Sequence, residues 1–90
     1  MSRVAREVRI ANRRGLHARA SAKFVTMAAG LPTVVMVEKD GSAVTGTSIM
    51  GLMMLGAAMG DTVTISAEGD GAEAAVSALS ALVETKFGED

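Results

Sequence analysis

The sequence predicts a single α+β domain, in which one four-stranded antiparallel sheet carries three helices on one face and leaves its other face open to solvent. Three observations favour this class. Hydrophobic periodicity changes along the chain in the order strand, helix, strand, strand, helix, strand, helix. Each predicted strand is amphipathic, which is typical of an antiparallel sheet covered on one side. The chain has only 90 residues, so we expect residues 1–90 to form one domain.

The first strand and the first helix are joined by a short polar turn. Alternating apolar and charged residues predict a strand over residues 4–11. A helix is predicted to begin at residue 17 or 18 and to end at residue 29, because Gly30 and Pro32 stop its continuation. Apolar residues recur at every third or fourth position and form one face of this helix, with Leu31 continuing the pattern just after it: Ala20, Phe24, Met27, Ala28 and then Leu31.

A hairpin and a short helix occupy the middle of the chain. Residues 33–39 are mostly β-branched or apolar and predict a strand, and residues 42–45 predict its partner. Asp40 and Gly41 between them favour the positive φ angles of a type I′ turn. Ser48 is a good N-cap residue and predicts a helix over residues 48–54.

The last strand and the last helix have the clearest patterns. Residues 61–67 alternate between apolar and hydroxyl side chains, which predicts a strand with one buried face. Asp70 followed by Glu73 resembles a capping box and predicts a helix N-terminus with Asp70 as the N-cap. Apolar residues then recur at helical spacing as far as Phe87, and Gly88 is expected to end the helix.

The composition excludes several classes of protein. The chain has no cysteine, which excludes a disulfide framework, a thiolate metal site and a thiol nucleophile. Its two aromatic residues leave little for stacking on bases or sugars. A single histidine cannot form a zinc site with the usual ligands, and the glycine spacing lacks the lysine of a Walker A loop. We therefore expect neither a metal nor a cofactor.

No segment has the features of a targeting or membrane-spanning sequence. The first ten residues carry three arginines and no continuous apolar run. The uncharged stretch over residues 41–60 contains five glycines and several hydroxyl side chains, so we do not expect it to insert into a membrane. These features predict a cytoplasmic protein.

The charges are distributed unevenly along the chain. The first 23 residues contain seven basic side chains and one acid, a net charge of +6, whereas residues 38–90 contain nine acids and two lysines, a net charge of −7. Such asymmetry indicates an anionic partner for the N-terminal part. The alternative is that the two halves neutralise each other in the folded chain.

His17 is the residue best placed for chemistry. It follows Gly15 at the start of the predicted first helix, where the backbone N–H groups of Ala18, Arg19 and Ala20 and the helix dipole favour an anion. The Arg19 guanidinium could pair with a phosphate there. A neutral imidazole is a nucleophile, so His17 is a candidate phosphoryl acceptor. The alternative is a surface N-cap without chemistry.

A run of six apolar residues is too dense to lie on one face of a short helix, so some members should be exposed. Methionine suits surfaces that accommodate several partners, and Met50 and Met53 are the best candidates. Leu52 and Leu55 are better explained as core. The run comprises Ile49, Met50, Leu52, Met53, Met54 and Leu55.

Two motifs resemble those of the HPr phosphocarriers of bacterial phosphotransferase systems. Residues 15–19 (Gly-Leu-His-Ala-Arg) resemble the active-site signature, and residues 47–53 resemble the regulatory-serine segment. The separation of 31 residues between His17 and Ser48 equals that of the family. The resemblance implies an open-faced β-sandwich of order βαββαβα with sheet order 1-4-2-3. Ala20 departs from the family's usual proline, which leaves the nitrogen-related NPr branch open beside the sugar branch.

The resemblance also implies a function. Enzyme I, or its nitrogen-related paralogue, would phosphorylate Nδ1 of His17, and the phosphoryl group would pass to an enzyme IIA-type acceptor, so the chain would be a covalent carrier rather than an independent enzyme. Arg19 would stabilise the phosphate, and an HPr kinase would phosphorylate Ser48. A monomer would dock its partners through Ile49, Met50 and Met53. The alternatives are a regulatory protein that relays little phosphate and a nucleic-acid-binding module that uses the N-terminal arginines.

Overall fold

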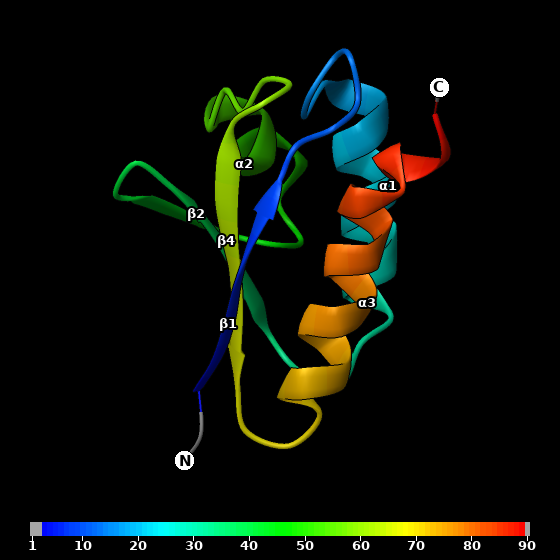
Figure 1. Ribbon diagram of the computed structural model, residues 1–90. Coiled ribbons are helices and arrows are strands. Elements are labelled where there is room, and N and C mark those ends of the chain that lie inside the picture. Colours follow the sequence, from blue (N-terminus) through cyan, green and yellow to red (C-terminus); the bar gives the residue numbers. More distant parts are fainter. Residues whose placement is uncertain (1–2, 90) are drawn as a thin grey trace.

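The computed structural model describes residues 3–89 and has the predicted order of elements (Figure 1). In chain order these are β1 (Arg3–Arg9), α1 (Ala18–Ala29), β2 (Val35–Lys39), β3 (Ser42–Thr45), α2 (Ile49–Met54), β4 (Thr62–Glu68), α3 (Ala72–Glu84) and a 3₁₀ turn, η1 (Lys86–Gly88).

The four strands form one antiparallel sheet of order β1-β4-β2-β3, which confirms the order implied by the resemblance. β4 lies between β1 and β2, where Ile65 pairs with Arg6 on one side and with Val37 on the other. Asp40 and Gly41 have φ angles of 50° and 84°, so the tight turn between β2 and β3 has the positive φ angles expected from the sequence.

The helices and the inner face of the sheet enclose one hydrophobic core. α3 packs along β1 and β4, and α1 packs against α2 and α3 (Figure 1). α2 lies beside β3, with Gly51 close to Val44. Charged side chains on the opposite face, such as Glu7 and Glu38, are exposed. The largest fully buried side chains include Phe24, Phe87, Ile10, Leu52, Ile65 and Leu79.

Several predicted boundaries on the N-terminal half shift by one or two residues. β1 ends at Arg9, although Ile10 still donates its N–H to the Asp61 carbonyl and remains fully buried. β2 begins at Val35 instead of residue 33, because the chain bends after Pro32. Met27 was expected on the buried face of α1 but is 36% exposed, since it lies at the margin of that face.

The prediction for the ends of the last helix was wrong at both termini. Asp70 is not the N-cap: Gly71 occupies that position with φ of 83°, and no side chain caps the helix. The helix ends at Glu84 with Thr85 as its C-cap, three residues before Phe87. Phe87 is nevertheless buried, because the chain turns into η1 and returns this ring to the core.

Candidate phosphoryl-acceptor site

The loop between β1 and α1 is held by backbone contacts with a distant segment. Gly15 has φ of 62°, and the Leu16 N–H donates to the Ala57 carbonyl over 3.0 Å. Ser21 donates its hydroxyl to the Leu16 carbonyl over 3.1 Å. Leu16 is also buried. Its contacts therefore hold the backbone in place just before His17 and the start of the helix.

His17 is the N-cap of α1. Its backbone is extended, with φ of −72° and ψ of 179°, and its carbonyl accepts the first helical hydrogen bond from Ser21 N–H over 2.9 Å. The Arg19 N–H donates to Nδ1 of His17 over 3.3 Å. His17 therefore both caps the helix and lies beside its first N–H groups. Nδ1 faces the positive end of the helix dipole.

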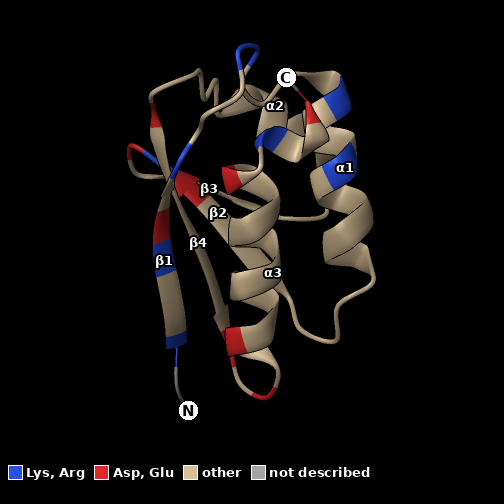
Figure 2. Cartoon of the chain, turned by 45° about the vertical axis from the view of Figure 1, so that its right-hand side comes forward, with Lys and Arg blue, Asp and Glu red and all other residues tan. Residues whose placement is uncertain are grey.

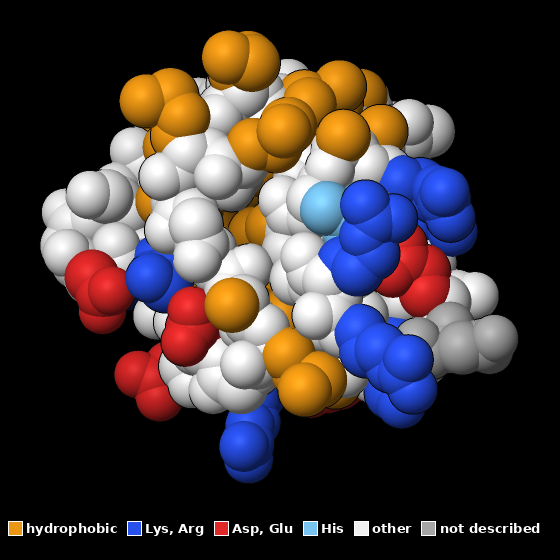
Figure 3. Space-filling view, turned by 90° about the horizontal axis from the view of Figure 1, so that it is seen from above, with side chains coloured by type: hydrophobic (Ala, Val, Ile, Leu, Met, Phe, Trp, Pro, Cys, Tyr) orange, Lys and Arg blue, Asp and Glu red, His pale blue; other side chains and the backbone are white. Residues whose placement is uncertain are grey.

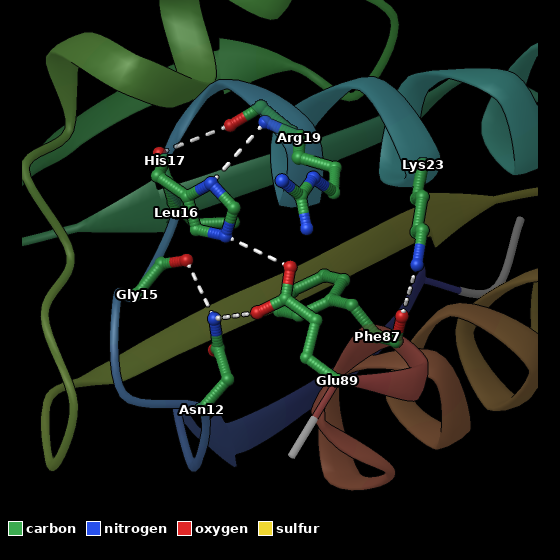
Figure 4. Close-up of polar contacts among 9 residues, drawn as sticks. Asn12, Gly15, Leu16, His17, Arg19, Lys23, Phe87 and Glu89 are labelled. Atoms are coloured by element: carbon green, nitrogen blue, oxygen red, sulfur yellow. Dashed lines mark hydrogen bonds and ion pairs between the residues drawn. The ribbon is translucent and has the colours of Figure 1, made fainter.

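Glu89 contacts the other ring nitrogen of His17 (Figure 4). Its Oε2 atom lies 2.8 Å from Nε2, and the two side chains are 15% and 14% exposed. Its Oε1 atom accepts a hydrogen bond of 3.2 Å from Nδ2 of Asn12, a residue with 0% exposure that also donates to the Gly15 carbonyl over 2.8 Å. Lys23 donates to the Phe87 carbonyl over 2.8 Å and so ties η1 to α1.

The surroundings of Glu89 lower the pKa of its carboxyl group. Partial burial acts to raise that pKa, but the hydrogen bonds from Asn12 and His17, together with favourable charge interactions that include Lys23, outweigh it. A carboxylate whose pKa falls on folding contributes stability above the ordinary pKa of Glu, and this contribution is lost as pH decreases through the lowered value. The ionised form of Glu89 is therefore the one that the folded chain favours.

Asn12, Lys23 and Glu89 were not predicted as part of the site. Asn12 lies in the short polar turn after β1, and Glu89 lies 72 residues from its histidine partner. Neither residue has a periodic pattern around it that could indicate the contact. Asn12 and Glu89 come together with His17 only in the folded chain, so no local sequence pattern identifies them as part of the site.

Basic side chains lie around one side of the histidine. In Figure 3 the His side chain lies beside Lys and Arg side chains, with hydrophobic side chains beyond it on the other side. Arg13, Arg14 and Arg19 are exposed. Among the described residues none of the arginines forms an ion pair with an acid, so their charges remain available to a ligand.

The residues expected to contact partners are exposed around α2. Ser48 caps this helix, since its hydroxyl oxygen accepts a hydrogen bond of 2.9 Å from Gly51 N–H. Ile49, Met50 and Met53 are exposed to 41%, 69% and 41%. Leu52 and Leu55 belong to the core, as expected from the sequence. Met54 and Met59 are also exposed, which extends the apolar surface beyond the predicted residues.

Residues 3–89 lack both a membrane-spanning helix and a cluster of metal ligands. No helix in this part of the chain has the length and hydropathy needed to span a bilayer. No three His, Asp or Glu side chains in the same range are grouped in a way that could bind a metal ion.

A family model and two named relatives match almost the whole chain. The model, described as "PTS HPr component phosphorylation site", matches residues 4–85. The chain is 44% identical over 84 residues to the phosphocarrier protein HPr of Cupriavidus necator, covering 93% of this chain and 94% of the relative. It is 42% identical over 92 residues to the phosphocarrier protein NPr of Shewanella violacea, covering 99% and 98%.

Solved structures share the fold. The crystal structure of HPr-C-His from Thermoanaerobacter tengcongensis matches with a TM-score of 0.88 and 47% identity, covering 100% of this chain and 99% of that one. A second structure from that organism, an HPr dimer, matches with a TM-score of 0.76 and 49% identity, covering 91% and 94%.

Proposed function

The chain belongs to the HPr family of phosphocarrier proteins of the phosphotransferase system, and we propose that His17 is the residue that takes up and hands on the phosphoryl group. The observation that carries the proposal is the position of the imidazole. His17 caps α1, its Nδ1 accepts from Arg19 N–H, and its side chain is partly exposed. A phosphoryl group on Nδ1 would meet backbone N–H groups at the positive end of a helix.

The proposed reaction is a substitution at phosphorus. The lone pair of Nδ1 forms the new N–P bond, while the bond between phosphorus and the donor breaks and its electron pair leaves with the donor. We propose enzyme I, charged by phosphoenolpyruvate, as the donor and an enzyme IIA-type protein as the acceptor. The backbone N–H groups of Ala18, Arg19 and Ala20 and the Arg19 guanidinium would offset the phosphate charge. The chain then acts as a covalent carrier that needs no cofactor.

Partner docking is proposed for the exposed apolar residues of α2. Ile49, Met50 and Met53 form what we term the docking patch, and their exposure supports a contact surface. Ser48, which begins the same helix, is the proposed position of regulatory phosphorylation by an HPr kinase. A phosphate there would add about −1.5 to −2 charge next to the docking patch.

Two branches of the family are candidates for the partners of this chain. Sugar uptake or its regulation is one, and nitrogen-related signalling through the phosphorylation state is the other. Similarity to relatives named HPr and NPr supports both, and Ala20 in place of the usual proline leaves the nitrogen-related branch open beside the sugar branch. In either branch we propose a cytoplasmic monomer, which size-exclusion chromatography with light scattering would test against the dimer known for one relative.

The test of the proposed function is phosphorylation by enzyme I. The chain is incubated with phosphoenolpyruvate and either the sugar or the nitrogen-related enzyme I, and we expect an acid-labile, base-stable phosphate. His17→Ala should carry no label, whereas Ser48→Asn, which keeps a capping side chain on α2, should be labelled as the wild type is. Equal labelling of His17→Ala would rule out His17 as the acceptor. The enzyme I that gives the faster reaction identifies the branch.

A further inference from the structure

We infer that Glu89 is a positioning residue whose carboxylate holds His17 in the tautomer with a proton on Nε2 and a lone pair on Nδ1. The inference rests on the proposed function, because it concerns how His17 is prepared to accept a phosphoryl group. The contact between Nε2 and Glu89 Oε2 of 2.8 Å is the first observation that supports it.

The backbone that brings Glu89 to the histidine adopts an uncommon conformation. Lys86, Phe87 and Gly88 have consecutive positive φ angles of 61°, 56° and 76°. Two of them are not glycine, and such a conformation persists only where surrounding contacts hold it. Phe87 supplies one contact, since its ring is 1% exposed in the core, and Lys23 supplies another through the Phe87 carbonyl. These contacts place the carboxylate of the next residue against His17.

The hydrogen bonds around the site all select the same tautomer. Asn12 donates from Nδ2 to the Gly15 carbonyl, so this atom is the amide nitrogen and presents a donor to Glu89 as well. Glu89, ionised at neutral pH, accepts at both oxygens. Its partner at Nε2 must therefore be an N–H group. On the opposite side of the ring, Arg19 N–H donates to Nδ1, which requires a lone pair there.

This tautomer suits both directions of phosphoryl transfer. When Nδ1 forms its bond to phosphorus, positive charge develops on the ring, and the carboxylate at Nε2 stabilises it. When the phosphoryl group moves to an acceptor, the N–P electron pair returns to Nδ1 and the ring leaves as a neutral imidazole, because Nε2 has kept its proton. The opposite tautomer would present an N–H group to the incoming phosphorus and could not attack it.

The inference is tested with Glu89→Gln. An amide accepts at one atom only, and Asn12 Nδ2 requires that atom to face it, so the glutamine NH₂ group would face Nε2. We expect the ring to shift toward the tautomer protonated at Nδ1, measured by the ¹⁵N chemical shifts of the imidazole in the unphosphorylated protein. The rate of phosphorylation by enzyme I should fall roughly 10- to 100-fold. Glu89→Ala should lower the rate less, because free imidazole prefers the proton on Nε2.

Glu84→Gln is the matched control, since it removes the same charge from an exposed position at the end of α3. It should change neither the tautomer nor the rate. A Glu89→Gln protein that keeps the wild-type tautomer, or the wild-type rate, would overturn the inference. A wild-type protein that takes up no phosphate would instead overturn the proposed function, and the ¹⁵N shifts distinguish the two failures because they require no phosphorylation.

Discussion

At the scale of single residues, Gly15 is the position near the site where the fold tolerates least change. Its φ of 62° lies in the left-handed region, and a Cβ atom there would clash with the Ala57 carbonyl oxygen. That oxygen also accepts the hydrogen bond from Leu16 N–H. A side chain at Gly15 would thus displace the contact that fixes the start of α1 and the orientation of His17.

We predict that Gly15→Ala lowers the free energy of unfolding by more than the cost of placing alanine at a left-handed φ. Gly56→Ala is the matched control, since Gly56 has a similar φ of 66° and nothing within 4 Å of an added Cβ. A left-handed alanine costs about 1–2 kcal/mol, and the clash at Gly15 should add roughly 1–3 kcal/mol. Urea unfolding of both variants measures the difference. Equal free energies of unfolding would show that the backbone moves away without penalty.

At the scale of secondary structure, α2 depends on its cap and its packing. The helix has six residues, too few to be stable by itself, and Ser48 supplies the side-chain cap. Only one of its residues, Leu52, is buried, and most of the others form exposed apolar surface. A negative charge at Ser48 agrees with the helix dipole, so we expect it to act on partner docking and not on folding.

Two variants, Ser48→Asp and Ser48→Asn, distinguish the effect of a negative charge at this position from the effect of capping the helix. Both side chains are good N-caps, so both variants should keep the free energy of unfolding within about 1 kcal/mol of the wild type. Only aspartate adds a negative charge beside the docking patch, and we expect it to slow phosphoryl uptake from enzyme I on the order of tenfold. Stopped-flow transfer assays measure this. If asparagine slowed the reaction as much as aspartate, charge would not be the cause.

At the scale of the whole molecule, positive charge is concentrated where the histidine lies. The loop after β1 and the first half of α1 contain Arg and Lys residues, whereas acidic residues are frequent around the turns that flank α3 and β4 (Figure 2). Among residues 3–89 the ion pairs involve His17 and Lys39 but none of the arginines, so the two halves do not neutralise each other by direct pairing. The net charge of −1 therefore understates the local field that an approaching partner meets.

This distribution predicts that association with enzyme I depends on ionic strength. We expect the second-order rate of phosphorylation to fall with added salt, and the double variant Arg13→Gln/Arg14→Gln to lower the rate about fivefold or more and flatten the salt dependence. Arg3→Gln/Arg6→Gln removes the same charge from the N-terminal part of β1, away from the strand end that leads into the loop with Arg13 and Arg14 (Figure 1). This second double variant should have a smaller effect on the rate. An equal effect of both pairs would argue for net charge instead of local steering.

Patterns confined to a few neighbouring residues were sufficient to predict much of the secondary structure of this molecule. The strand predicted from alternation and the Asp40-Gly41 turn depend only on backbone geometry, and both were confirmed, although Ser66 of β4 is buried together with the apolar residues of the strand. The cap of α2 by Ser48 needs a hydroxyl three residues before an N–H, and it was also confirmed. The placement of His17 at the start of α1 belongs to the same class. Each of these features joins residues that are adjacent in sequence, so no distant contact competes with the local preference.

Features that join distant residues were decided only by the tertiary structure. The sheet order followed from a resemblance and not from periodicity, because any antiparallel neighbour satisfies an amphipathic strand. The continuous helix predicted as far as Phe87 was wrong, since burial of that ring favours a left-handed turn over further helix. The same turn brings Glu89 to His17 and Asn12 across 72 and 77 residues. The sequence by itself thus singled out His17 as the candidate acceptor, because the features that indicate it are local, whereas the tertiary structure determined that Nε2 of this residue contacts a carboxylate.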